Sequence, residues 1–241
     1  KKHQEEAIKK LLIFQTNDFY KIFKTMAPKP VTIRLLDPPL HEFLPVESAQ
    51  INKVAKNLKT TNKIIKEKID NLRELNPMLG HRGCRLGITN PEITIMQITA
   101  IFNAAHKLKN KHINCRPEIM IPLVSSLNEF INQKNLVDKI AKKLNHKFKK
   151  KVSYSIGTMI ELPRACIVAD KIAKHADFIS FGTNDLTQTT FGFSRDDIAS
   201  FLPLYLEKKI LPADPFVSLD LHGVGLLIKL AIKKAKKSNP K

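Results

Sequence analysis

Two carboxylates and a short polar loop stand where apolar segments of the chain end. Residues 154–160 form a β-rich run that ends at Glu161, and residues 177–181 form a second run that ends in Gly182-Thr183-Asn184-Asp185. Mg²⁺ prefers one or two carboxylates, with water and substrate oxygens completing its coordination. Backbone N–H groups of the Gly-Thr-Asn-Asp loop can add donors for an anion if the loop opens a helix. Such groups suit phosphoryl transfer, in which a cation neutralises charge on the phosphate.

Arginine usage points to the same class of ligand. The chain has 34 lysines and only 7 arginines, yet five arginines fall in junctions rich in Gly, Pro and Asp, namely Arg34, Arg82, Arg85, Arg164 and Arg195. Arginine makes planar bidentate contacts to phosphate or carboxylate that lysine does not make. We therefore expect an anionic ligand, with Arg34 and Arg82 able to hold phosphate oxygens.

Each of these residues, taken alone, also fits a structural role. A carboxylate at a strand end is often a helix cap or an ion-pair partner, and Gly-Thr-Asn-Asp can be a turn. Arg85 and Arg164 fit pairs with nearby carboxylates or helix ends. His41 and His81 fit hydrogen-bonded structural positions better than roles as acids or bases. Spacing alone therefore supports an anion site and leaves the reaction open.

Strands that alternate with helices are needed to bring these groups to one edge of a sheet. In parallel α/β sheets that edge is formed by the carboxyl ends of the strands. Strands are expected at residues 31–36, 117–122, 152–160 and 177–181, with a further candidate at 82–88. Helices of 12 residues or more separate the main candidates, which is typical of βαβ units and a parallel sheet.

The expected helices follow from apolar spacing and capping residues. Residues 4–14 are amphipathic, and Thr16-Asn17-Asp18 can cap a separate second helix. Residues 47–75 fit two polar helices that face solvent. Pro163 sits in the first turn of a helix that continues through the apolar positions up to Ala176.

Composition limits the classes of protein. A chain of 241 residues with 43% hydrophobic residues can bury a sizeable core, and no linker marks a boundary, so we expect a single domain over residues 1–241. No apolar run is long enough for a membrane helix. Three scattered cysteines indicate neither disulfides nor zinc, and they fit a cytoplasmic location. The net charge of +19 comes mainly from lysine without interleaved aromatics, so nucleic-acid binding is a poor explanation.

Five motifs resemble the C-terminal phosphoenolpyruvate-binding domain of the pyruvate phosphate dikinase family. They are TIRLLDPPLHEFLP (32–45), NPMLGHRGCRLGITNPEI (76–93), IMIPLVSS (119–126), GTMIELPRACIVAD (157–170) and SFGTNDLTQTTFGFSRDD (180–197). The resemblance covers nearly the whole chain. It implies an α/β fold of the (β/α)₈ TIM-barrel type, here incomplete because the family's first and last strands would lie outside residues 1–241.

The resemblance also implies an activity and a set of partners. In the family, a phosphoryl group moves between phosphoenolpyruvate and a phosphohistidine on another domain, and an ATP-grasp domain completes the cycle. The full enzyme is expected to be a homodimer. Motif matches assign Mg²⁺ ligation to Glu161 and Asp185, and substrate binding to these two residues together with Arg34, Arg82, Gly182, Thr183, Asn184 and Arg195.

One expected group has no counterpart in the sequence. The family's proton donor to the pyruvate enolate is a cysteine in a CGEHGG-like motif, and none of Cys84, Cys115 and Cys166 has that context. No catalytic residue is therefore assigned, and the chain alone is expected to be inactive. The alternative hypothesis is a non-catalytic remnant or interaction module. A barrel without its first and last strands is also expected to aggregate or to pair with another copy.

Overall fold

The structure is a computed structural model that describes residues 2–240, apart from the side chains of Lys2 and His41. The chain divides into two compact units. Unit 1 consists of Lys1–Val31, Leu35–Arg116 and Leu136–Val152, and unit 2 consists of Thr32–Arg34, Pro117–Asn135 and Ser153–Lys241. The single domain expected over residues 1–241 stays a prediction.

Four strands form one parallel sheet and confirm the α/β class. The sheet order is β1-β2-β3-β4, and the strands are β1 (Pro30–Arg34), β2 (Arg116–Ile121), β3 (Ser155–Ile160) and β4 (Phe178–Phe181). β2 pairs with β3 and β3 with β4 in parallel register. Four consecutive parallel strands are consistent with part of a (β/α)₈ barrel.

The additional strand considered at residues 82–88 is wrong. This segment is the helix α4 (Gly83–Thr89), in which Cys84 and Leu86 are buried. Its short apolar run fits either kind of element, and periodicity cannot separate a short strand from a short buried helix.

The core of unit 2 lies around the central strands. Ile119 and Ile121 of β2 and Ile156 and Ile160 of β3 are almost completely buried. Thr158, also fully buried, donates its hydroxyl to the carbonyl of Ile121 at 2.8 Å. Burial of both faces explains why these strands read as apolar runs.

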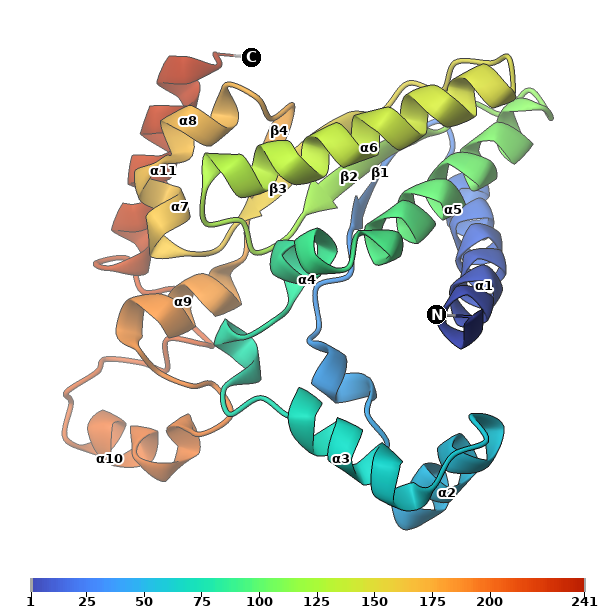
Figure 1. Cartoon of the computed structure of the whole chain (residues 1–241). Helices are drawn as coiled ribbons and strands as arrows, with labels where there is room; N and C mark the ends of the chain where they lie inside the picture. Colours follow the sequence, from blue (N-terminus) through green and yellow to red (C-terminus); the bar gives the residue numbers. More distant parts are fainter. Residues whose placement is uncertain (1, 241) are drawn as a thin grey trace. The chain divides into compact units, whose positions relative to one another are not determined.

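Short helices of unit 2 follow β3 and β4. α7 (Pro163–Ile167) and α8 (Ala169–Ala173) replace the single helix expected up to Ala176, because Val168 adopts φ −104° and ψ 18° between them. α11 (Val224–Ser238) packs against both (Figure 1). The remaining elements after β4 are α9 (Thr183–Phe191), the 3₁₀ turn η3 (Ile198–Ser200) and α10 (Leu202–Glu207).

Asp220 caps the start of α11. Its carboxylate accepts hydrogen bonds from the backbone N–H groups of Gly223 at 2.8 Å, Val224 at 3.0 Å and His222 at 3.1 Å. Burial alone would raise the pKa of Asp220, but these backbone donors and the nearby His222 outweigh it and lower the pKa from its ordinary value. The ionised carboxylate therefore stabilises the folded chain.

Replacement of this cap gives a stability prediction. Asp220→Ala should lower the free energy of unfolding by about 1 kcal/mol, because it removes the acceptor for the first N–H groups of α11. The folded-state pKa is lowered, so the loss should be present above about pH 4 and disappear as the pH falls further. Urea unfolding of both proteins at pH 7 and pH 3 measures it. A difference at pH 3 as large as the difference at pH 7 would contradict the role of the ionised cap.

Unit 1 is largely helical. The long helix α1 (Lys2–Met26) packs against α5 (Pro91–Lys109) (Figure 1). Phe23 of α1 is fully buried. The expectation of two helices separated at Thr16 is wrong. Thr16 is buried, and its hydroxyl donates to the carbonyl of Leu12 at 2.6 Å, so it bonds back into a continuous helix instead of capping a new one.

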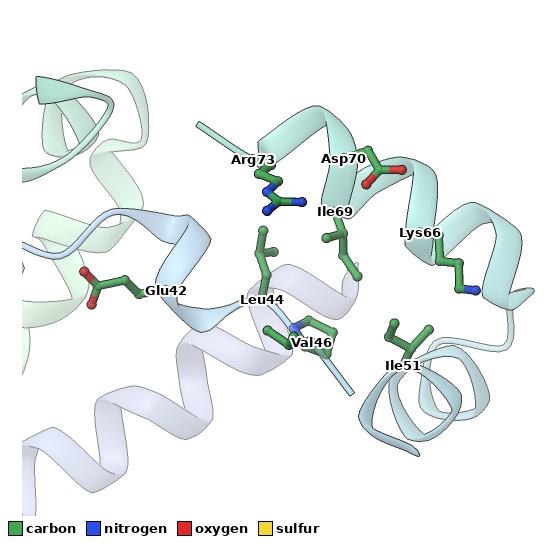
Figure 2. A pocket seen from close by; sticks show the side chains of 9 residues that line it. Glu42, Leu44, Val46, Ile51, Lys66, Ile69, Asp70 and Arg73 are labelled. Carbon is green, nitrogen blue, oxygen red and sulfur yellow. The ribbon is translucent and has the colours of Figure 1, made fainter. Parts of the chain in front are cut away.

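Two helices of unit 1, together with residues 42–46, line an open pocket of about 460 Å³. They are α2 (Ser48–Asn57) and α3 (Asn62–Leu72), and they confirm the two helices expected over residues 47–75. Figure 2 shows apolar side chains between them and charged side chains on α3. The lining residues are Glu42, Leu44, Pro45, Val46, Ile51, Lys66, Ile69, Asp70 and Arg73, and none belongs to the predicted site.

The other elements complete the chain. They are the 3₁₀ turns η1 (Leu40–Phe43) and η2 (Pro77–Leu79) and the helix α6 (Leu127–Lys147). No helix within residues 2–240 combines the length and apolar character needed to cross a membrane.

Candidate functional site

Glu161 is a fully buried carboxylate directly after β3. Its side chain Oε1 accepts a hydrogen bond from the backbone N–H of Leu123 at 2.5 Å, so one oxygen is held by the turn that follows β2. Because β2 and β3 are parallel neighbours, their carboxyl ends meet at the same edge of the sheet. Burial of a carboxylate is costly unless a cation or hydrogen-bond donors compensate it. The full burial of Glu161 therefore marks it as a candidate site residue.

Leu123 adopts a backbone conformation that is unusual for its residue type. Its φ is +58°, in the left-handed region, and its side chain is 1% exposed. This region costs a non-glycine residue about 1–2 kcal/mol. The strained turn aims the N–H of Leu123 at Glu161. No residue in PLVSS marks it in advance, because glycine or asparagine would be the usual sequence signal.

Gly182 lies against Glu161 at the end of the next strand. β3 and β4 are in register at Ile160 and Phe181, and the N–H of Gly182 donates to the carbonyl of Ile160 at 3.1 Å. A Cβ on Gly182 would overlap Glu161 Oε2 and would lie 2.9 Å from Met159 Sδ. Glycine is therefore needed for the close approach of the buried carboxylate to the loop after β4, since its φ of −93° is open to any residue.

Alanine at this position tests the close approach. Gly182→Ala should destabilise the chain by about 1–3 kcal/mol, because the added methyl group must displace Glu161 or the backbone. Gly192→Ala is the matched control. Its Cβ would meet nothing within 4 Å, and only its φ of +68° opposes the substitution, at about 1–2 kcal/mol. Because Glu161 is a predicted Mg²⁺ ligand, only Gly182→Ala should also weaken the binding of Mn²⁺, a paramagnetic substitute for Mg²⁺. Equal Mn²⁺ affinity in both variants, measured by paramagnetic resonance, would contradict the role of Gly182.

The loop after β4 opens the nine-residue helix α9. Thr183 is its first residue and is exposed, whereas Asn184 and Asp185 are half-buried in the first turn. The first N–H groups of a helix have no partner within it, so this end carries partial positive charge and favours an anion. The helical start expected for Thr-Asn-Asp-Leu-Thr is confirmed.

Arg195 lies beside Asn184 on the same unit. Its Nη1 donates to Asn184 Oδ1 at 2.7 Å, and its guanidinium lies 5.9 Å from the ring centre of Phe216. Its backbone N–H donates to Oε1 of Gln188 at 2.9 Å, and Gln188 is itself 7% exposed. These contacts fix both the backbone and the head group of Arg195. The motif match named Arg195 and Asn184, but it gave no indication of Gln188 or Phe216.

The two predicted phosphate-binding arginines have different environments. Arg34 is the last residue of β1 and is exposed, at one end of the sheet order in unit 2. Arg82 belongs to unit 1 and is buried, where its Nη2 forms an ion pair with Asp37 Oδ2 at 2.9 Å. Its Nη1 also donates to the carbonyl of Met78 at 3.1 Å. Sequence reasoning missed this structural partner of Arg82.

The remaining candidates have structural roles in the described residues. Cys84 and Cys166 are buried free thiols, and burial raises the pKa of Cys166 to about 11. The ring of His81 lies 2.5 Å from the hydroxyl of Thr89, which agrees with a structural histidine. The side chain of His41 lies outside the part of the chain that the structure describes.

Unit 2 thus brings together most of the predicted site. Glu161, Gly182, Thr183, Asn184 and Asp185 lie on the segments that follow β3 and β4, and Arg195 contacts Asn184. Within residues 2–240, no cluster of three or more His, Cys, Asp or Glu side chains is arranged to hold a metal ion. A cation held by Glu161 and Asp185 would therefore have to complete its coordination with water and substrate oxygens, as Mg²⁺ commonly does.

Comparison with known proteins identifies the family of the sequence. A profile described as "PEP-utilising enzyme, PEP-binding domain" matches residues 1–239. The chain is 53% identical to a pyruvate, phosphate dikinase of Rickettsia bellii over 235 aligned residues, and these residues make up 97% of this chain. It is 51% identical over 232 residues, or 95% of the chain, to a chloroplastic pyruvate, phosphate dikinase 1 of Arabidopsis thaliana.

These alignments cover only part of each relative. The chain spans 27% of the Rickettsia bellii protein and 24% of the Arabidopsis thaliana protein, about a quarter of the length in both cases. The similarity is therefore to one region of a larger protein. It supports the resemblance drawn from the five sequence motifs.

Proposed function

Since the chain belongs to the family of PEP-utilising enzymes and matches their PEP-binding domain, we propose that it forms the phosphoenolpyruvate- and pyruvate-binding part of a pyruvate phosphate dikinase. The proposed reaction is phosphoryl transfer between phosphoenolpyruvate and a phosphohistidine on another domain. An ATP-grasp domain, a homodimeric full enzyme and a cytoplasmic location belong to the same proposal.

The contact between Glu161 and the loop at Gly182 carries this proposal. It combines a fully buried carboxylate, a glycine that permits close approach, and a helix whose first turn contains a second carboxylate, Asp185. A phosphorylated carboxylic acid such as phosphoenolpyruvate carries negative charge at both ends. Cationic and N–H donor groups at the carboxyl ends of parallel strands suit such a ligand.

The residues present fit a divalent cation. Glu161 Oε1 is held by Leu123, which leaves the opposite oxygen oriented toward the loop where a Cβ on Gly182 would overlap it. Asp185, in the first turn of α9, supplies the second carboxylate. When bound, Mg²⁺ supplies charge neutralisation for phosphate and enolate oxygens. Glu161 and Asp185 would hold it, and no other carboxylate is required.

The arginines have separable roles in this proposal. Arg34, at the end of β1, and Arg82 would bind the phosphate through bidentate contacts. Arg195 would approach the substrate from the segment that follows α9, where Asn184 of α9 and the ring of Phe216 orient its guanidinium. Asn184 would donate its amide group to the substrate, since its side-chain oxygen already accepts a bond from Arg195.

Calorimetric titration of this chain with phosphoenolpyruvate tests the proposal. We expect phosphoenolpyruvate to bind more strongly in the presence of Mg²⁺ than in the presence of EDTA, because a cation held by Glu161 and Asp185 would neutralise charge on the phosphate. Inorganic phosphate and lactate serve as ligand controls, since each carries only one of the two substrate groups. A folded chain that shows no heat of phosphoenolpyruvate binding with Mg²⁺ would overturn the proposal and favour the non-catalytic remnant.

A further inference from the structure

Two contacts join the turn after β3 to the turn after β2. The first is the hydrogen bond from the N–H of Leu123 to Glu161 Oε1 at 2.5 Å. The second is formed three residues later, where Arg164 Nη1 donates to the carbonyl of Ser125 at 2.5 Å. All four residues lie in unit 2. Residues 161–164 therefore contact the turn after β2 twice, through the Glu161 carboxylate and through the Arg164 guanidinium.

The turn after β2 needs support to keep its conformation. Leu123 is held at φ +58°, and strained backbones of this kind persist only where their surroundings determine them. If the turn relaxed, the N–H of Leu123 would no longer point at Glu161. The contacts that hold residues 122–126 therefore control the orientation of the Glu161 side chain.

Glu129 also supports this turn. Its Oε2 accepts bonds from the backbone N–H of Ser125 and of Ser126, both at 2.8 Å, and from the Ser125 hydroxyl at 2.7 Å. Burial alone would raise the pKa of Glu129, but these donors outweigh it and lower that pKa, so the side chain is an anionic acceptor at neutral pH. Glu129 thus holds the N–H groups of the turn, and Arg164 holds its carbonyl.

We propose that Arg164 is a positioning residue for the Glu161 carboxylate, acting through the Ser125 carbonyl and the left-handed turn at Leu123. This inference rests on the proposed function of Glu161 as a ligand of the divalent cation. Arg164 does not itself touch the cation or the substrate. It keeps one oxygen of Glu161 bonded to Leu123 and the other close to the loop at Gly182, where the carboxylate would hold the cation.

Groups that orient a metal ligand commonly change metal affinity by about 10- to 100-fold when they are removed. We therefore expect Arg164→Met to reduce the gain in phosphoenolpyruvate affinity provided by Mg²⁺ by about 10-fold. Affinity measured in EDTA should remain unchanged, because the phosphate-binding arginines are intact. Arg164→Lys should recover part of the loss, since an ammonium group can still donate to a carbonyl.

A control variant separates this effect from a general loss of stability. Lys234 donates to the carbonyl of Ile167 in α7 at 2.6 Å and to Asp170 Oδ1 at 3.0 Å, and neither partner belongs to the turn at Leu123. Lys234→Met should leave the Mg²⁺ dependence of phosphoenolpyruvate binding unchanged. It should also leave the hydrogen exchange of the Leu123 amide unchanged, whereas Arg164→Met should accelerate that exchange.

The two readouts distinguish failure of this inference from failure of the proposed function. If the wild-type chain shows no Mg²⁺-dependent binding, the proposed function is overturned, and Leu123 exchange still decides whether Arg164 holds the turn. Faster exchange in Arg164→Met but not in Lys234→Met supports the positioning role. Unchanged exchange together with an unchanged Mg²⁺ dependence in Arg164→Met overturns it.

Discussion

Glu161→Gln is expected to remove the Mg²⁺ dependence of phosphoenolpyruvate binding while the chain stays folded. Glutamine keeps the size of the side chain and can still accept the Leu123 N–H, but it has no charge with which to hold the cation. Loss of one member of a buried charged pair costs about 2–5 kcal/mol. Because about 1.4 kcal/mol corresponds to a factor of ten, the affinity with Mg²⁺ should fall at least about 30-fold.

A second glutamate provides the control for this experiment. Glu118 lies on the neighbouring strand β2, where it accepts a hydrogen bond from the hydroxyl of Thr32 at 2.6 Å. Glu118→Gln makes the same change of charge without touching the site. Calorimetry with Mg²⁺ and with EDTA should separate the two variants. Equal Mg²⁺ dependence in Glu161→Gln and the wild type would exclude Glu161 as a metal ligand.

Arg82→Met is expected to produce the largest loss of stability. The ion pair of Arg82 with Asp37 is buried, with side-chain exposures of 5% and 6%. Removal of the arginine leaves the aspartate charge buried beside an apolar side chain, which costs about 3–5 kcal/mol. The free energy of unfolding of the chain, measured by urea denaturation, reports this change.

A double variant shows whether the loss of stability in Arg82→Met comes from the buried charge of Asp37. Arg82→Met combined with Asp37→Asn should be more stable than Arg82→Met alone, because the buried carboxylate is then neutral. Arg73→Met removes an exposed arginine of the same unit and should change stability by less than about 0.5 kcal/mol. A loss in Arg82→Met no larger than that of Arg73→Met would contradict the importance of the buried pair.

Elements with clear local signals, such as a β-rich run or a proline in the first turn of a helix, could be predicted from the sequence. Residues 154–160 are rich in β-forming residues and Pro163 marks the next helix start, so the sequence predicts β3 and the start of α7. The break between α7 and α8 at Val168 is not predicted. Thr16 was misread because a threonine inside a helix can satisfy its hydroxyl with the preceding turn, and this bond has no signal in the sequence.

The site could be predicted only in part. The motifs identify the side chains that would bind metal and substrate, but they do not identify the residues that hold those side chains in place. Glu161 and Asp185 were identified as a pair at successive strand ends, and the register of β3 and β4 brings their segments together. The left-handed turn at Leu123 and the hydrogen bond from Arg164 to the carbonyl of Ser125 depend on tertiary contacts between distant segments, so the sequence does not predict them. Arg164 was expected to pair with a carboxylate or helix end, and it pairs with a loop carbonyl instead.

Glu161 and Asp185 are proposed to hold a divalent cation at the phosphate of phosphoenolpyruvate. Mn²⁺ can replace Mg²⁺ as a paramagnetic probe, since both prefer oxygen ligands. Electron–nuclear double resonance of Mn²⁺ with the wild-type chain and phosphoenolpyruvate should show coupling to the phosphorus nucleus. The coupling should be lost in Glu161→Gln and in Asp185→Asn. Bound Mn²⁺ without phosphorus coupling in the wild type, or coupling retained in both variants, would contradict the claim.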